Sequence, residues 1–238
     1  MEVYKDIEII DLFLYLKKYN TLVIGDVHIG YEEALNKEGV LIPRFQFKDT
    51  LTRLEKAIKN KRFDSIILLG DVKHEFGTIS ETEWRNTLQF LDTLLGYTKN
   101  VILIKGNHDK ILEPIANKRN LEVKDYVRMG EIILLHGHVI PEKNKDFKDS
   151  KIIIIGHEHP AISITDKLKT ESYKCFLRGE YKSKVLIVVP SFNLVTEGTD
   201  ISKEELLSPF LHQDLKDFMV FVVSDKVYDF GKLKNILK

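Results

Sequence analysis

Short apolar runs, each ended abruptly by polar residues, recur along the first two thirds of the chain. A run of three to five apolar residues is too short for a buried helix, so each predicts an inner strand of a parallel sheet. Every one of these runs is followed by a turn that carries aspartate, asparagine or histidine. The runs lie at residues 22–24, 65–69, 101–104, 132–135 and 152–155.

Between these runs the apolar residues change to helical spacing. Residues 31–38 suit a short helix, and residues 47–58 place apolar side chains on one stripe, which predicts a helix that crosses between two parallel strands. Ser80 and Glu83 form a capping box before a further helix. We expect the core-facing stripe of that helix at Trp84, Leu88, Leu91 and Leu95.

The second half of the chain is richer in predicted strands. Apolar and polar residues alternate after Pro160, an inner strand is expected at 185–189, and a closing hairpin begins near Phe218. We expect a charged loop at 141–151 and a brief helix capped by Ser202. The pattern predicts an α/β fold with two sheets packed in layers and helices outside.

Composition bears on the binding partners, the number of domains and the cellular compartment more than on the reaction. The 36 basic residues balance 36 acidic ones, so composition gives no argument for nucleic-acid or membrane binding. The length of 238 residues fits a single domain, residues 1–238. Cys175 is the one cysteine, the first residues do not resemble a signal peptide, and the longest apolar run is too short to span a bilayer. We therefore expect a cytoplasmic protein.

The strand-end turns hold seven of the eight histidines, together with aspartate and asparagine. Imidazole and carboxylate ligands suit manganese, iron and zinc, whereas calcium and magnesium prefer sites built almost wholly of oxygen. Seven candidate ligands are too many for one tetrahedral centre, so we expect two divalent metal ions. Manganese is the first choice, with iron, zinc, nickel or magnesium as alternatives. The candidates are Asp26, His28, Asp71, Asn107, His136, His157 and His159.

Five motifs follow one another in a fixed order between residues 25 and 159: Gly-Asp-x-His, Gly-Asp, Gly-Asn-His-Asp, His-Gly-His and Gly-His-x-His. This series resembles the calcineurin-like metallophosphoesterase superfamily. The resemblance implies a four-layer sandwich of two mixed β-sheets flanked by helices, with a dinuclear metal site at the carboxyl ends of the strands. It also implies ligand sets: Asp26, His28 and His159 for the first metal, Asn107, His136 and His157 for the second, and Asp71 between them.

Other residues receive roles from the same resemblance. His108 would stabilise the transferred phosphoryl group or protonate the leaving oxygen, and Asn107, His108 and His138 are expected to contact the substrate. His138 is ambiguous, since the first histidine of His-Gly-His normally binds metal. His74 stands three residues after Asp71, as in the nuclease and phosphodiesterase branch, where protein phosphatases instead have an Asp-Arg pair.

A wider set of residues is similar to the ligase-associated DNA repair phosphoesterases and their archaeal relatives. This set includes Gly30-Tyr31, Pro43, residues 70–76, residues 190–193 and Gly198. We also considered two basic residues as phosphate contacts, although a solvated surface role suits each of them better. These are Lys73 and Arg44.

The leading hypothesis is a dinuclear metal-dependent phosphoesterase that acts on phosphodiesters, with DNA or RNA as candidate substrates. A metal-bridging hydroxide would attack phosphorus, while His108 and His74 assist departure of the alcohol. One alternative is a phosphomonoesterase acting on a nucleotide or small phosphorylated metabolite. Another is a non-catalytic metal-binding scaffold, although such proteins usually lose ligands. A metallo-β-lactamase-type hydrolase is disfavoured because its His-x-His-x-Asp-His run does not occur.

Overall fold

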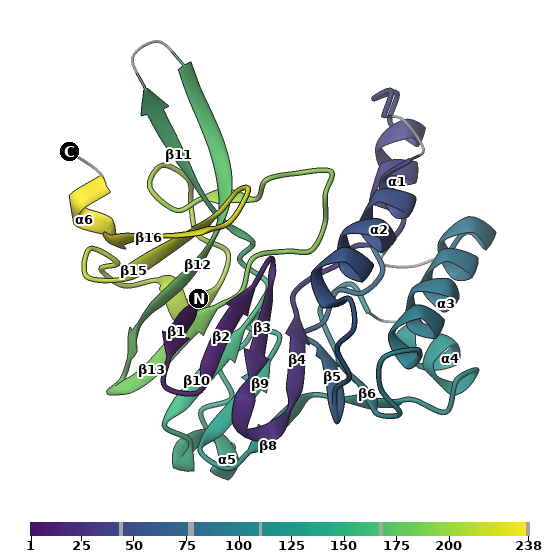
Figure 1. The fold of residues 1–238 in the computed structure, drawn as a ribbon, viewed down its shortest axis with the longest axis horizontal. Coiled ribbons are helices and arrows are strands. Elements are labelled where there is room, and N and C mark those ends of the chain that lie inside the picture. The colour runs from purple at the N-terminus through teal and green to yellow at the C-terminus, as the bar shows by residue number, and fades with distance from the viewer. Residues whose placement is uncertain (43–44, 76–78, 110, 167–168, 237–238) are drawn as a thin grey trace.

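Two β-sheets pack face to face, with helices on the outside, in the computed structural model of the chain (Figure 1). The structure describes residues 1–42, 45–75, 79–109, 111–166 and 169–236. Within these ranges no helix is both long and apolar enough to cross a membrane.

The first sheet has seven strands in chain order, because each new strand is added beside the previous one. Its first four strands pair antiparallel, and the last four, from β4 onward, pair parallel. This is the mixed sheet that the sequence predicts. The strands are β1 (Glu2–Tyr4), β2 (Ile7–Ile10), β3 (Phe13–Leu16), β4 (Thr21–Ile24), β5 (Ser65–Leu68), β6 (Val101–Ile104) and β7 (Glu122–Lys124).

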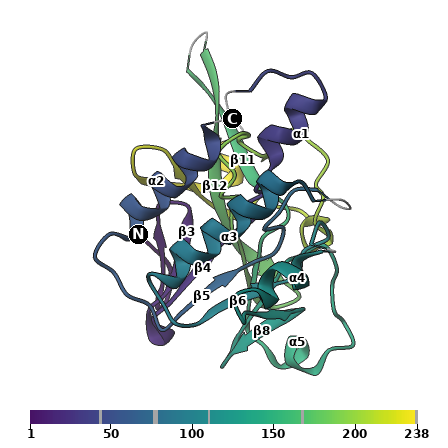
Figure 2. The same cartoon turned by 90° about the vertical axis from the view of Figure 1, so that its right-hand side faces the viewer.

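Helices cover the outer face of this sheet, and Figure 2 shows α2 and α3 crossing in front of its strands. The crossover helix α2 buries Leu54 and Ile58, as its apolar stripe predicts. The buried face of α3 is shifted by one residue toward the N-terminus from the expected stripe. Thr87 and Leu94 are buried in place of Leu88 and Leu95, and Trp84 is only half-buried. The helices that bury residues here are α2 (Gln46–Ile58), α3 (Glu81–Leu95) and α4 (Leu112–Asn117), whereas η1 (Lys17–Tyr19) and α1 (Tyr31–Lys37) bury none.

The second sheet has nine strands and is also mixed. Strands β9, β10 and β13 are parallel neighbours, whereas the long strand β12 pairs antiparallel with β11, β13 and β15. The strands are β8 (Tyr126–Met129), β9 (Ile132–Leu135), β10 (Ile152–Ile155), β11 (Pro160–Asp166), β12 (Lys169–Tyr181), β13 (Lys184–Val188), β14 (Thr199–Asp200), β15 (Met219–Val223) and β16 (Val227–Lys232).

Short helical elements cover the outer face of this second sheet, which makes the fourth layer thin. They are α5 (Lys145–Asp149), η2 (Pro209–Leu211) and α6 (Leu233–Ile236). Alternation along β10 explains how one strand serves two cores: Ile154 packs between the sheets, while Ile153 and Ile155 pack under the short helices.

Two local predictions are wrong for identifiable reasons. The charged segment 141–151 is not only a loop, because Asn144 caps α5 by accepting a hydrogen bond from Phe147 N at 3.0 Å. Ser202 does not begin a helix. Its backbone N–H and hydroxyl both bond to the Asp200 carboxylate, which holds the segment in a turn instead.

The arrangement brings distant strand ends to one edge of the sandwich. The carboxyl ends of β4, β5 and β6 in the first sheet meet those of β9 and β10 in the second. Backbone hydrogen bonds lace the emerging turns together, including Phe192 N to Asp26 O at 2.7 Å and Gly156 N to His136 O at 2.9 Å. Side chains on these turns must therefore crowd into a small volume.

Candidate metal centre

The turns after the strands place their polar side chains by bending sharply. Four candidate ligands have positive φ: His28 at 48°, Asp71 at 46°, His157 at 65° and His159 at 51°. Left-handed backbone is unfavourable for residues with a Cβ, and it persists where surrounding structure enforces it. Gly106, next to the site, is required for space rather than for a positive φ. A Cβ on Gly106 would collide with the Asp71 carboxylate.

The first group of candidate ligands forms around Asp26. Nε2 of His28 lies 3.3 Å from Nε2 of His159, and the latter nitrogen lies 3.4 Å from Asp26 Oδ1. Asp26 is fully buried, and both of its carboxylate oxygens accept a hydrogen bond from the backbone N–H of His157, at 3.2 and 3.0 Å. These two hydrogen bonds fix the orientation of the Asp26 carboxylate without a bound metal ion.

The second group forms around His136, which is almost completely buried. Its Nδ1 lies 2.8 Å from Leu69 O, so this nitrogen carries a proton and donates it to the carbonyl. The other nitrogen, Nε2, then faces the site, 3.0 Å from Asn107 Oδ1 and 3.1 Å from His157 Nδ1. Three atoms that can bind a metal converge there.

Asp71 lies between the two groups. Its Oδ2 is 3.3 Å from His136 Nε2 and 3.9 Å from His28 Nε2. Its Oδ1 accepts a hydrogen bond from the backbone N–H of His108 at 2.9 Å. The structure therefore brings all seven candidate ligands around one volume, with Asp71 reaching both sides.

His108 and His74 stand beside this volume rather than within either group. His108 Nδ1 lies 2.6 Å from the His74 carbonyl oxygen, so Nδ1 donates, and its Nε2 lies 4.0 Å from Asp71 Oδ2. The two rings stack with centroids 5.5 Å apart, and both flank His28. His138 contacts the rings of His136 and His157 from the other side.

Burial and neighbouring charges set the protonation of the histidines. Burial lowers the pKa of His28 to about 3 and that of His157 to about 4, because a charged imidazole loses its hydration there. Burial acts in the same direction on His136, but the carboxylates of Asp26 and Asp71 outweigh it and raise the pKa to about 9. The surrounding histidines lower the pKa of Asp26 against the opposing effect of burial.

The geometry suits divalent cations. Among the described residues, three sets place their possible ligand atoms within 4.8 Å of one another. They are Asp26, His28 and His159; Asp71, His136 and His157; and the all-histidine set His28, His74 and His108. Around His136 Nε2, an imidazole nitrogen, an amide oxygen and a carboxylate oxygen face one another, a juxtaposition that a positive ion between them would stabilise. The raised pKa of His136 agrees with a place that favours positive charge.

A cavity of about 320 Å³ opens over these side chains. His28, Asp71 and Asn107 line it, together with Tyr31, Asn193, Thr196 and Leu207. Tyr31 and Asn193 belong to the wider set of residues that resembles the repair phosphoesterases, whereas Thr196 and Leu207 lie outside every predicted motif. The signal for Asn193 was present in the sequence, because it follows the apolar run 185–189 just as the other site residues follow theirs.

Further residues hold the site from behind. Asp109 accepts hydrogen bonds from Val72 N at 3.1 Å and Gly106 N at 3.0 Å, which joins the turns after β5 and β6. Burial and the nearby Asp71 raise the pKa of Asp109 to about 7. The expected capping box forms only in part: the Glu83 backbone N–H donates to Ser80 Oγ at 3.0 Å, but the Glu83 carboxylate instead accepts from the backbone N–H groups of His74 and Glu75.

Of the two basic residues considered as phosphate contacts, the structure describes Lys73. Lys73 is wholly buried, so the expectation of a solvated side chain is wrong. Its Nζ donates to the carbonyl oxygens of Glu75 and His108, and it therefore stiffens the turn that carries His74. Arg44 lies outside the described residues, as does Pro43.

Comparisons with known proteins agree with this geometry. The family described as Calcineurin-like phosphoesterase matches residues 19–196. No curated protein sequence matches the chain. Among solved structures, nuclease MPE from Pseudomonas putida is 18% identical, with a TM-score of 0.66 and 93% of each chain covered.

Two further solved structures align over most of their length. A single mutant of Vps29 from Entamoeba histolytica is 21% identical with a TM-score of 0.38, and the alignment covers 92% of this chain and 95% of that one. Yfce, a phosphoesterase from E. coli, is 13% identical with a TM-score of 0.40, and the alignment covers 92% of this chain and 99% of that one.

Two sandwiched mixed sheets with paired histidine and carboxylate groups at the strand ends define a metallophosphoesterase. The match over most of the sequence makes the assignment specific: the chain belongs to the calcineurin-like phosphoesterase family. The superfamily resemblance and the fold expected from the sequence are thereby confirmed. The family implies a phosphoester substrate and divalent metal ions.

Proposed function

We propose that this protein is a dinuclear metal-dependent phosphodiesterase of the nuclease type. The observation that carries the proposal is the placement of Asp71, whose carboxylate reaches both His28 and His136. One carboxylate between two ligand groups suits two cations held a few ångströms apart, a recurring arrangement in phosphoester hydrolysis. Asp26, His28 and His159 would hold the first ion, and Asn107, His136 and His157 the second.

Bound metal ions would activate water and neutralise charge on the phosphate oxygens. The chain supplies the remaining tasks. His108 presents Nε2 toward the site because its Nδ1 donates to the His74 carbonyl. In the imidazolium form, with a proton on each nitrogen, Nε2 can donate a hydrogen bond to the phosphoryl group or deliver its proton to the leaving oxygen. His74 lies against it and lines the same cavity, where a leaving alcohol would depart.

His74 also favours a diester over a monoester. Burial lowers the pKa of His74 to about 4, so the imidazole is neutral at pH 7 and can bond an ester oxygen without adding charge. A monoester carries one more negative charge than a diester, and its recognition would be helped by a basic side chain. Among the described residues lining the cavity there is no lysine or arginine.

Nucleic acid is the substrate class that we favour. A nuclease is among the structures that share this fold, and the resemblance of residues 70–76 to the ligase-associated repair phosphoesterases supports a role in DNA repair. The balanced charge of the chain lacks the basic footprint expected of a duplex binder. Single-stranded or damaged DNA or RNA is therefore the proposed substrate.

The remaining expectations become part of this proposal. Manganese fits the mixture of imidazole, carboxylate and amide ligands better than an all-oxygen metal does. The core shared by both sheets supports one domain over residues 1–238. A single, fully buried cysteine, Cys175, suits a reducing compartment such as the cytoplasm.

The test compares bis(4-nitrophenyl) phosphate with 4-nitrophenyl phosphate, each with manganese, magnesium or zinc. We expect faster hydrolysis of the diester and the highest rate with manganese. Labelled single-stranded and duplex DNA in the same assay should show cleavage of the single strand. Preference for the monoester would favour the phosphomonoesterase alternative, and bound metal without hydrolysis of either ester would favour a scaffold.

A further inference from the structure

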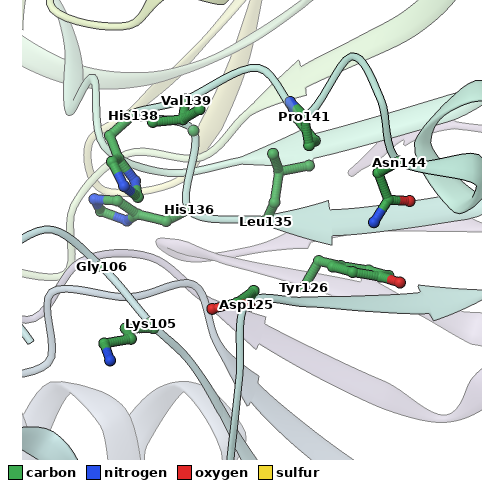
Figure 3. Close-up of a pocket in the computed structure, with 11 residues that line it drawn as sticks. Lys105, Gly106, Asp125, Tyr126, Leu135, His136, His138, Val139, Pro141 and Asn144 are labelled. Atoms are coloured by element: carbon green, nitrogen blue, oxygen red, sulfur yellow. The ribbon is translucent and has the colours of Figure 1, made fainter.

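A second cavity, of about 390 Å³, adjoins the candidate metal centre (Figure 3). We call it the side cavity and define it by His136, His138, Tyr126, Leu135, Pro141 and Asn144. Its volume falls within the range of small-molecule sites, which spans about 300–1,000 Å³. Neither the family assignment nor the proposed chemistry gives it a role.

The side cavity and the metal centre meet at His136. His136 lines the side cavity, while its Nε2 lies 3.0 Å from Asn107 Oδ1 and 3.1 Å from His157 Nδ1, both of which line the metal cavity. His138 also lines the side cavity, and its ring centroid is 5.2 Å from that of His136. The rings of His136 and His138 thus stand between the two cavities, and a group attached to a phosphate at the metals would have to pass over them to reach the side cavity.

The walls of the side cavity suit a flat aromatic group. Figure 3 shows Tyr126 and Pro141 on opposite sides, with Leu135 between them. The Tyr126 hydroxyl donates to Asp146 Oδ2 at 2.9 Å, which fixes the position of the ring. A planar base can therefore lie along an anchored tyrosine and the apolar side chains of Leu135 and Pro141; stacking on aromatic side chains is how proteins often hold single-stranded nucleic acid.

A polar group stands at the far end. Asn144 Oδ1 already accepts the hydrogen bond from Phe147 N that caps α5, so its amide nitrogen is turned the other way. Figure 3 shows this nitrogen on the side of the cavity. It can donate to a ring nitrogen or carbonyl of a base.

The charges at the rim argue against a second phosphate in the side cavity. Lys105 is paired with Glu113 at 3.5 Å, so its charge is partly compensated. Asp125, on the same rim, is an exposed carboxylate. An uncharged base and sugar fit this rim better than another anion does.

We propose that the side cavity binds the base of a nucleotide next to the scissile phosphate. This inference rests on the proposed phosphodiesterase function and adds to it a physical reason for a nucleic-acid substrate. Tyr126 supplies the stacking surface, Asn144 contacts the edge of the base, and His138 lines the path between base and phosphate.

The experiment measures binding rather than turnover. Isothermal titration of the manganese-loaded protein compares methylphosphonate with the 5′- and 3′-phosphonates of adenosine, whose P–C bonds are not hydrolysed. We expect one of the nucleoside phosphonates to bind roughly tenfold tighter than methylphosphonate, since stacking of one base on an aromatic side chain has about that effect.

Matched variants locate the preference. Tyr126→Phe keeps the ring and loses only the bond to Asp146, so it should retain the preference. Tyr126→Ala should reduce the ratio of the two affinities to about one. Val139→Trp, at a residue with 58% of its surface exposed on the cavity wall, should do the same by filling the space. Thermal unfolding of each variant checks that it is folded.

The possible failures are distinguishable. Equal affinity for methylphosphonate and both nucleoside phosphonates in the unmodified protein would overturn the base site and leave the phosphodiesterase proposal standing. A preference that survives in both Tyr126→Ala and Val139→Trp would also overturn it. Failure to bind manganese or any phosphonate would instead overturn the proposed function, and the base site with it.

Discussion

Asp71 and His108 are joined by a hydrogen bond from the His108 backbone N–H to Asp71 Oδ1, yet the two side chains should respond differently to substitution. Asp71→Asn keeps the shape but loses the negative charge between His28 and His136. We expect metal occupancy and turnover to fall together, each by at least roughly 100-fold, because even residues behind metal ligands affect affinity by about 10–100-fold. Elemental analysis and diester hydrolysis measure the two effects. Normal turnover in this variant would contradict the bridging role.

His108→Ala should separate chemistry from metal binding. His108 belongs to neither of the two groups that contain a carboxylate; its ring nitrogen lies within 4.8 Å of those of His28 and His74 in a third group, which offers no carboxylate to balance a cation. We therefore expect unchanged metal content and a kcat reduced by roughly 10²–10⁴-fold, the usual effect of removing a general acid or base. His212→Ala is the matched control, since His212 is exposed and lies near the Leu206 carbonyl, away from both ligand groups. Loss of metal from His108→Ala would show that its role is misassigned.

At the scale of elements, one buried lysine holds a loop against the site. Lys174 on β12 donates from Nζ to Ser191 Oγ at 2.9 Å, Thr196 O at 2.6 Å and Glu197 O at 3.1 Å. The loop 190–198 carries Asn193 and Thr196, which line the metal cavity. Burial lowers the pKa of Lys174 to about 8, so it is charged at pH 7 and its bonds to these oxygens are strong.

Lys174→Met should loosen this loop while keeping the side-chain volume. We expect unfolding to become easier by about 1–3 kcal/mol, because buried acceptors lose their donor, and we expect KM for the diester to rise. Lys184→Met is the control, since Lys184 also donates to backbone carbonyls, those of Lys148 and Ser150, but lies away from the cavity. An equal rise in KM in both variants would indicate a general loss of stability instead.

At the scale of the whole molecule, the metal-free protein should be sensitive to mild acid. The pKa values of His28, His74 and His157 are lowered to about 3, 4 and 4, so between these values and the unfolded value near 6.5 the unfolded chain binds more protons. Their contribution to stability is therefore present above about pH 6.5 and lost as pH falls toward 4.

Two groups with raised pKa values act against this trend. His136, raised to about 9, is protonated in both states below about pH 6.5, so it opposes the trend only close to pH 7. Asp109, raised to about 7, binds a proton in the folded state that the unfolded chain has lost, so acid stabilises it. Three histidines outweigh these two groups between pH 5 and pH 7.

Urea unfolding of the chelator-treated protein at pH 7 and pH 5 measures this effect. We expect a lower midpoint at pH 5, and a higher midpoint at pH 7 when manganese is added, because the cation binds only the folded state. Protonation of His28 and His157 should also make acid release the metal. A midpoint that does not change between the two pH values would contradict the burial of these groups as neutral imidazoles.

Residue type and order along the chain were enough to predict the strands and the candidate ligands. Four-residue apolar runs such as that of β10 cannot form buried helices, and Gly156-His157 directly after it can only be a turn. The superfamily resemblance rested on the same short segments. Local physical chemistry determines both, because strand propensity and turn geometry depend on neighbours in the chain.

Only the tertiary structure decided which side chains from different turns contact one another. The sequence suggested a solvated Lys73, but folding buries it beneath His108, and it gave Lys174 no role although this residue fastens the loop beside the cavity. It also could not place Tyr126 and His138 around one cavity, because a β-hairpin separates them in the chain. Such contacts depend on how the two sheets pack, and packing is a property of the whole chain rather than of any segment.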